Sequence, residues 1–97
     1  MAAYLIANIE VHDAEAFGRY GALVAPMVAQ FGGRYLVRGG ALEHVEGATG
    51  LKRLVILQFA DMAALRAFYF SEEYKPLLAM RQAATTSHVT LAEGYAP

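Results

Sequence analysis

A ten-residue segment, Phe31–Gly40, constrains the possible folds of this chain more than any other. It reads Phe-Gly-Gly-Arg-Tyr-Leu-Val-Arg-Gly-Gly. Glycine accepts the positive φ with which many helices end, so we expect a helix to end at Gly32. The next five residues are typical of a β-strand, which the Gly39–Gly40 pair interrupts as a bulge or an end. Arg34 and Arg38 are an even number of positions apart, so we expect both to point to the same side of a sheet; a one-residue bulge in this strand would invert which face they occupy.

Short strands and helices alternate along the rest of the chain. Period-two alternation and β-branched or aromatic residues predict the strands, and apolar residues at helical spacing predict the helices. Pro26 should kink or split the first helix. Strands are expected at 3–11, 34–38, 52–60 and 85–95, and the second could continue past the glycine pair toward Val45. Helices are expected after the potential capping residues Asp13, Asp61 and Ser71, and the last of them carries Tyr74, Leu77, Leu78 and Arg81.

The order of these elements predicts an α+β fold. Strand–helix–strand–strand–helix–strand makes two split βαβ units, which form a ferredoxin-like sandwich with one antiparallel four-stranded sheet and helices on one face. We expect residues 1–97 to form this single domain. The opposite sheet face keeps apolar side chains such as Tyr4, Ile6, Leu54 and Ile56. Because such a patch is rarely left in water, we expect a homodimer that packs sheet against sheet.

Composition excludes several classes of function. The net charge is −1, so no basic field attracts nucleic acid or an anionic membrane. The chain has no cysteine, which excludes disulfides, thiolate catalysis and cysteine-based metal sites. It has no apolar run of the roughly 18 residues that a membrane span needs, and its N-terminus lacks the basic region of a signal peptide. We therefore expect a soluble cytoplasmic protein.

Three segments resemble a family of small bacterial proteins, catalogued as domain-of-unknown-function family 1330. They are the Gly32–Gly40 block, the Arg53–Leu57 strand and the Ser71–Tyr74 segment. The resemblance implies the dimeric α+β barrel superfamily, whose members include cofactor-free monooxygenases, haem-dependent enzymes, muconolactone-type isomerases and proteins with no known activity. It implies no established chemistry for the family itself. The family usually has Glu where this chain has Gln58, so a carboxylate base of its relatives would be absent here.

Two residues are candidate catalytic groups. His88 could act as a general acid or base, since histidine side chains in general titrate near neutral pH; the alternative is a histidine that only satisfies hydrogen bonds on its strand. Arg38 could hold a carboxylate or enolate through its planar guanidinium; the alternative is an ion pair with Glu43, Glu46 or Glu93.

Five further residues are candidates for binding a ligand. Most lie on strand faces expected to point away from the helices, toward a cavity in the dimer barrel. The amides among them could orient a ligand carbonyl or only pair with each other, and the tyrosine could line the cavity mouth or be a core residue. These candidates are Asn8, Gln58, Arg34, Tyr69 and Thr90.

Two functional hypotheses follow. The first is that the protein has a small-molecule pocket, either between sheet and helices or in the dimer barrel. It could then be a cofactor-free enzyme that acts on a small carboxylated or aromatic metabolite. The second is a non-catalytic accessory or structural dimer whose polar residues satisfy one another. Histidines at positions 12, 44 and 88 show no metal-ligand spacing, so no metal site is expected, and no cofactor is predicted.

Overall fold

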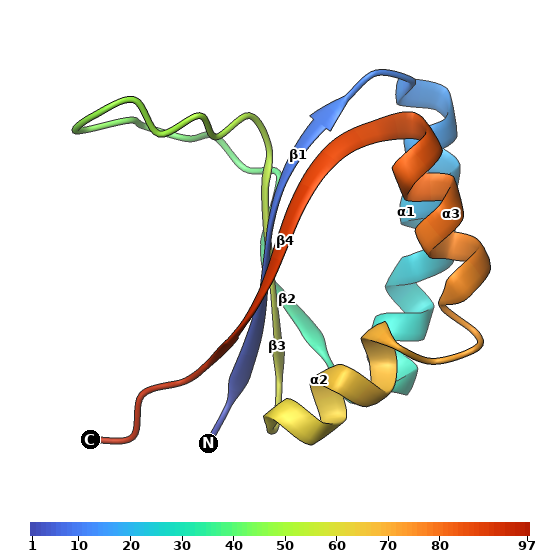
Figure 1. The fold of residues 1–97 in the computed structure, drawn as a ribbon, viewed down its shortest axis with the longest axis vertical. Coiled ribbons are helices and arrows are strands. Elements are labelled where there is room, and N and C mark those ends of the chain that lie inside the picture. The colour runs from blue at the N-terminus through green and yellow to red at the C-terminus, as the bar shows by residue number, and fades with distance from the viewer.

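The computed structural model describes residues 1–97, which form one antiparallel sheet covered on one face by three helices (Figure 1). The strands lie in the order β2–β3–β1–β4. This topology confirms the predicted ferredoxin-like fold. In chain order the elements are β1 (Ala3–Val11), α1 (Ala14–Gln30), β2 (Arg34–Arg38), β3 (Leu54–Phe59), α2 (Met62–Tyr69), α3 (Lys75–Ala84) and β4 (Thr85–Glu93).

Side-chain caps begin the first two helices as the sequence predicts. Asp13 Oδ1 accepts a hydrogen bond from Ala16 N at 3.0 Å, and Asp61 Oδ1 accepts one from Ala64 N at 2.7 Å. Pro26 does not split α1, which is one helix of 17 residues. Ser71 caps a turn rather than α3 itself. Its Oγ accepts a hydrogen bond from the backbone N–H of Tyr74, which precedes the helix.

A bulge in β2 overturns the expectation that its two arginines share a face. Arg34 lies opposite Gln58 of β3, but the register shifts between Tyr35 and Val37, so Arg38 lies opposite Val55. Gln58 points to the open face of the sheet and Val55 toward the helices. The two arginines therefore lie on opposite faces. The irregularity falls inside the strand and not at the glycine pair, where it was predicted.

Strand β2 ends at Arg38 and does not continue toward Val45. Residues 40–53 form no strand and instead make a loop that projects from the sheet on the side away from the helices (Figure 1). Asn8 fixes the base of this loop, since its amide nitrogen donates to Gly50 O and its amide oxygen accepts from Lys52 N, both at 2.9 Å. The prediction of a continuation toward Val45 is wrong.

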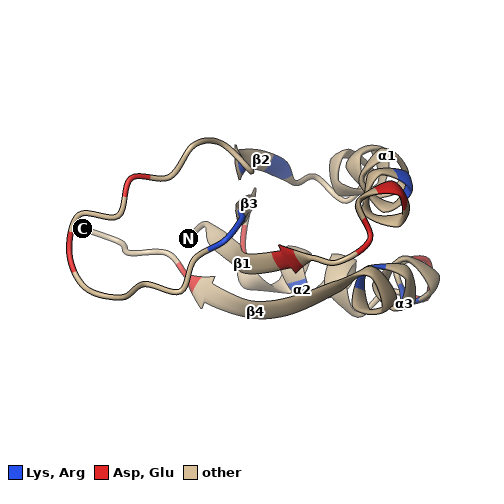
Figure 2. Ribbon diagram, turned by 90° about the horizontal axis from the view of Figure 1, so that it is seen from above, with Lys and Arg blue, Asp and Glu red and all other residues tan.

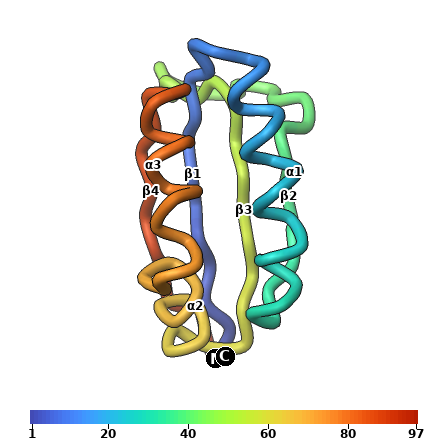
Figure 3. The backbone as a smooth tube through the Cα atoms, turned by 90° about the vertical axis from the view of Figure 1, so that its right-hand side faces the viewer, coloured from blue at the N-terminus to red at the C-terminus, as the bar shows by residue number.

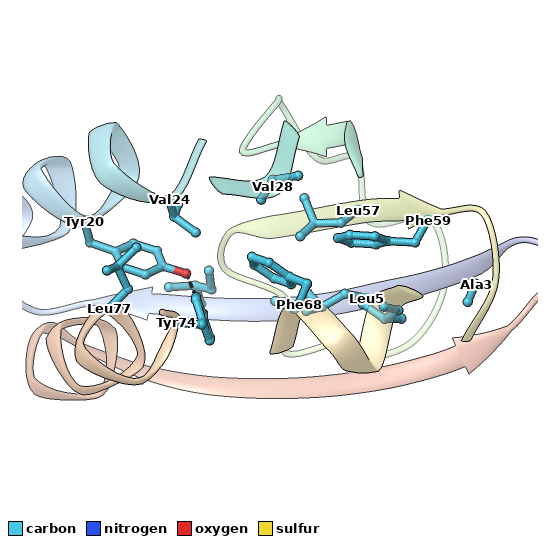
Figure 4. Packing of buried hydrophobic residues seen from close by; sticks show 13 residues of the cluster. Ala3, Leu5, Tyr20, Val24, Val28, Leu57, Phe59, Phe68, Tyr74 and Leu77 are labelled. Atoms are coloured by element: carbon cyan, nitrogen blue, oxygen red, sulfur yellow. Dashed lines mark hydrogen bonds between the residues drawn. The ribbon is translucent and has the colours of Figure 1, made fainter. Parts of the chain in front are cut away.

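The helices divide the covered face of the sheet between them. Seen from the helix side, α1 runs along the β2 edge and α3 along the β4 edge, so the central strands pass beneath the seam between them (Figure 3). At one end of this layer, rings fill the interior: the centroids of Phe59 and Phe68 are 5.4 Å apart, and both side chains are fully buried (Figure 4). At the other end lie Tyr20 and Tyr74 (Figure 4).

The uncovered sheet face exposes several large apolar side chains, as the sequence predicts. Ile6 and Leu36 remain 37% and 45% exposed, and Leu54 and Ile56 beside them are only half-buried. The accessible surface of the chain is 5991 Å². A compact monomer of 10.5 kDa exposes about 5,400 Å². This excess is the surface expected of a chain with an unpartnered face and a projecting loop.

The glycine pair after β2 gives a test of the loop geometry. Gly39 has a φ of +69°, and a Cβ there would collide with the guanidinium of Arg53. We expect Gly39→Ala to lower the free energy of unfolding by about 1–3 kcal/mol, because both the backbone and Arg53 must shift. Gly40 has no positive φ and open space around it, so Gly40→Ala should change stability by less than about 0.5 kcal/mol. Urea denaturation measures both; equal losses would contradict the structure.

Candidate functional site

A cavity of about 70 Å³ lies between the sheet and the helices. It is lined by 17 residues, of which 13 are apolar or aromatic, contributed by all four strands and all three helices. The other four are Gly21 and three arginines: Arg38, Arg53 and Arg81. No aspartate or glutamate lines it. An apolar enclosure with a few convergent polar groups is the usual form of a small-molecule site.

Arg81 is the most deeply buried of the three cations. It extends from α3 and is only 4% exposed, and its Nη2 donates to the hydroxyl of Tyr69 at 3.1 Å. Burial lowers the pKa of Arg81, but the neighbouring Tyr74, Tyr20 and Tyr69 outweigh burial and raise that pKa above its ordinary value. The guanidinium therefore carries its charge at every pH at which the protein is folded.

Arg38 and Arg53 reach the same cavity from the β2–β3 side. Arg38 Nη2 donates to Gly21 O at 3.3 Å, and its guanidinium carbon lies 4.4 Å from the centre of the Tyr35 ring. Arg53 lies 5.3 Å from the centre of the Phe17 ring, and its buried Nε has no hydrogen-bond partner. These ring contacts are cation–π interactions, which supply attraction without neutralising the charge.

None of the three cavity arginines has a carboxylate partner. The two ion pairs of the protein are Arg19–Glu15 and Lys75–Glu72, both on the surface. The ion pair considered as an alternative for Arg38 does not occur. Acidic segments instead lie on the projecting loop and near the ends of elements (Figure 2). The cavity therefore combines three positive charges with no negative one.

Two buried tyrosines supply hydroxyl groups to the cavity. The hydroxyls of Tyr20 and Tyr74 are 2.8 Å apart and hydrogen-bond to each other (Figure 4). Burial, and then the proximity of Tyr74, raise the pKa of Tyr20 far above its ordinary value. Burial also raises the pKa of Tyr35, although Arg38 opposes that effect. Tyr20 and Tyr35 are therefore neutral hydrogen-bonding groups near physiological pH.

The structure divides the predicted site residues between the two faces of the sheet. Arg38 and Tyr69 line the cavity. His88 and Thr90 are exposed on the open face of β4. The remaining candidates have structural partners: Asn8 holds the loop, and Gln58 accepts a hydrogen bond from Arg34 Nε at 2.7 Å.

Sequence reasoning missed most of the cavity wall. It placed Arg81 on the apolar stripe of α3 without assigning it a role, although a cation within such a stripe is a usable signal. It gave no signal for Arg53, because the residue precedes β3 and its inward direction depends on the loop. Five cavity residues with polar groups were not predicted as site residues. They are Tyr20, Tyr35, Arg53, Tyr74 and Arg81.

Two further features bear on what the protein can bind. No three of its histidine, aspartate and glutamate side chains gather as metal ligands would. None of the helices combines the length and the hydropathy of a membrane span.

A family model described as a domain of unknown function, DUF1330, matches residues 2–95. The chain belongs to the DUF1330 family. This match confirms the resemblance carried by the Gly32–Gly40 block and its companion segments. None of the curated proteins matches this DUF1330 chain in sequence.

Solved structures similar to this DUF1330 chain share its fold at low sequence identity. A protein of unknown function from Rhodopseudomonas palustris has a TM-score of 0.78 and 18% identity, with 99% of this chain and 84% of that chain covered. A dimeric ferredoxin-like protein of unknown function from Jannaschia sp. CCS1 has a TM-score of 0.70 and 18% identity, with 97% and 100% covered. SnoaB, a cofactor-independent oxygenase from Streptomyces nogalater, has a TM-score of 0.64 and 17% identity, with 99% and 95% covered. At these identities the likeness shows the fold alone.

The buried tyrosine pair predicts a specific loss of stability in alkali. An unfolded tyrosine releases its proton near pH 10, whereas folding raises the pKa of Tyr20. Above about pH 10 the unfolded state therefore binds fewer protons, and Tyr20 lowers the free energy of unfolding by about 1.4 kcal/mol per pH unit. At pH 7, Tyr20→Phe should cost about 1–2 kcal/mol, because Tyr74 loses its buried partner.

The cost of Tyr20→Phe should then shrink by about 1 kcal/mol between pH 10 and pH 11, because the unfolded tyrosine is half deprotonated at pH 10 and the variant no longer carries this titrating group. Chemical denaturation at pH 7, 10 and 11 measures the difference. Tyr95→Phe is the matched control, because Tyr95 is 89% exposed and should show no pH-dependent difference. A cost that stays constant with pH would contradict the assigned burial of the Tyr20 hydroxyl.

Proposed function

We propose that this protein binds a small carboxylated or aromatic metabolite in the cavity between sheet and helices, and acts on it without a cofactor. The observation that carries the proposal is one cavity that combines a mostly apolar and aromatic lining with three guanidinium groups and neutral tyrosine hydroxyls. Such groups stabilise negative charge on a ligand oxygen without reorganising. The cofactor-independent oxygenase among the similar structures supports this reading at the level of the fold.

The chemistry of the cavity limits the reactions that it supports. It contains no carboxylate and no histidine, so no ordinary protein base can take a proton from a ligand there. A substrate would have to be acidic itself, such as a carboxylic acid, an enol or a phenol. Arg38 and Tyr69 are then binding and charge-stabilising groups rather than proton acceptors.

The open face of the sheet, which carries His88, is a second candidate location for the site. It lies on the open face of β4, opposite Asn8 of β1, with Thr90 further along the same strand face. A second copy packed on that face would enclose these side chains, together with Gln58 and Arg34, between two sheets. His88 would then be the catalytic group of a site in the dimer barrel.

A non-catalytic accessory dimer is the alternative, and one observation favours it. Of the polar candidates on the open face, Asn8 is hydrogen-bonded to the loop, and Arg34, Gln58 and Tyr4 form a chain of hydrogen bonds. Groups already satisfied in this way need no ligand. The alternative applies to the open face and leaves the cavity arginines unexplained.

Two variants on adjacent residues of β3 distinguish the possible sites. Val55 lines the cavity, and the side chain of Ile56 points to the open face. Val55→Phe should fill the small cavity and abolish binding of benzoate, phenol or salicylate, whereas Ile56→Phe should retain it. Ligand-observed NMR measures binding, and circular dichroism confirms folding. The reverse pattern would move the site to the barrel. No binding to the parent, and no small adduct in native mass spectrometry, would favour the accessory role.

We also propose that two copies of this chain associate through their open sheet faces. The exposed apolar side chains of that face support it, as does the dimeric neighbour of the same fold. Native mass spectrometry at micromolar concentration should give two chains of 10.5 kDa each. Ile56→Lys should give single chains or unfolded protein, because a buried unpaired charge opposes association. Leu23→Lys places the same charge on a 52% exposed position of α1 and should leave the dimer intact. A parent protein that is a stable monomer would contradict this interface.

A further inference from the structure

The cavity shares a wall with a polar groove on the molecular surface. The groove has a volume of about 430 Å³ and is lined by residues from α2, α3 and β4. Tyr69, Arg81 and Val89 line both the cavity and the groove. The remaining groove residues, all small or polar, are Gln82, Thr85, Thr86 and Ser87. An apolar compartment and a polar one therefore meet at Arg81.

Arg81 lacks the negatively charged partner that a buried cation normally has. Its side chain carries five N–H donors; one donates to the Tyr69 hydroxyl at 3.1 Å, and the Tyr74 hydroxyl is its other hydrogen-bonding neighbour. It has no ion pair, and neither compartment is lined by an acidic residue. Buried charges in proteins are usually paired, because desolvation without a counter-charge is costly. A carboxylate is the group whose two oxygens match the remaining donors.

The other two cavity arginines increase this demand for an anion. Arg38 and Arg53 lie against aromatic rings, and the Arg53 Nε is buried without a partner. A neutral ligand would leave the buried charge of Arg81 and the partly buried charge of Arg53 uncompensated, whereas the exposed Arg38 is also hydrated. On the groove side, the Gln82 amide is a further potential donor to an anion, whereas the Thr85 and Ser87 hydroxyls already bond to each other at 2.6 Å.

We propose that the cavity and the groove form one two-compartment site for an amphipathic organic acid, with Arg81 binding its carboxylate. The apolar or aromatic body lies in the cavity, and the carboxylate lies at the boundary, where Arg81 meets the groove. Tyr69 occupies the same boundary and must release or share its hydrogen bond with Arg81 when the acid binds. This inference rests on the proposed function, and adds the class of ligand, its direction in the site and the residue that recognises it.

Matched probes test the charge preference. Benzoate and benzamide have nearly the same shape and differ in charge, and NMR titration gives the Kd of each. We expect the parent protein to bind benzoate at least about tenfold more tightly than benzamide, the gain typical of a charge-assisted hydrogen bond. Arg81→Met should abolish the preference by weakening benzoate alone. Arg66→Met, the same change at an exposed arginine of α2, should preserve it.

Each other outcome of this titration identifies what fails. Equal affinities in the parent, or a preference that survives in Arg81→Met, would overturn the assignment of Arg81 while leaving the cavity as a binding site. Failure of both probes to bind at millimolar concentration would overturn the proposed function, and this inference with it.

A second measurement needs no ligand. If Arg81 is present for a ligand, the ligand-free protein gains little from its charge, and Arg81→Met should keep the Tm within about 2 °C of the parent or raise it. If Arg81 is a structural residue, its loss should lower the Tm by about 10 °C or more, because an essential buried interaction is removed. The second result would overturn the proposal whatever the probes show.

Discussion

Packing of one face of the sheet against three helices determines the stability of this fold and the position of its cavity. Alternate residues of β1 and β3 point into this layer, and Phe59 and Phe68 fill one end of it. At the other end lie Tyr20 of α1 and Tyr74, which precedes α3, and their hydroxyls must hydrogen-bond because they are buried. The pair occupies space that closely packed aliphatic side chains would fill. The cavity lies beside this pair, where Tyr20 and Tyr74 both line it.

The charges in this layer are not explained by folding alone. A core position filled by arginine is disfavoured unless a counter-charge compensates it, and hydrophobic replacements of buried ions are often neutral or stabilising. Arg53 is partly buried, and its cation–π contact with Phe17 recovers only a part of its desolvation cost, whereas Arg38 is exposed to solvent and carries little such cost. Selection for stability would remove such residues. Their presence around one enclosed space is understandable if the missing negative charge arrives with a ligand.

Most of the fold could be predicted from the sequence, because hydrophobic periodicity encodes the elements and their order encodes the topology. The prediction failed where the pattern is ambiguous. In β2, Tyr35, Leu36 and Val37 are all apolar, so any of them could be the extra residue of a bulge. Only pairing with β3 decides which, and that pairing sends Arg38 inward and Arg34 outward. The site was harder to predict, because its charged wall comes from α3, β2 and the residue before β3, and no local motif links them.

The same alternation explains how the two faces of a thin sheet can have separate roles. On β3, Val55 and Leu57 line the cavity, while Leu54 and Ile56 point to the open face. A chain of 97 residues has too little interior to hold a ligand site and also cover both faces of its sheet. Packing a second copy on the open face would remove that conflict, since each copy would supply the other's missing layer. The interior of each chain would then be free to hold polar and charged groups that a solitary domain of this size could not stabilise.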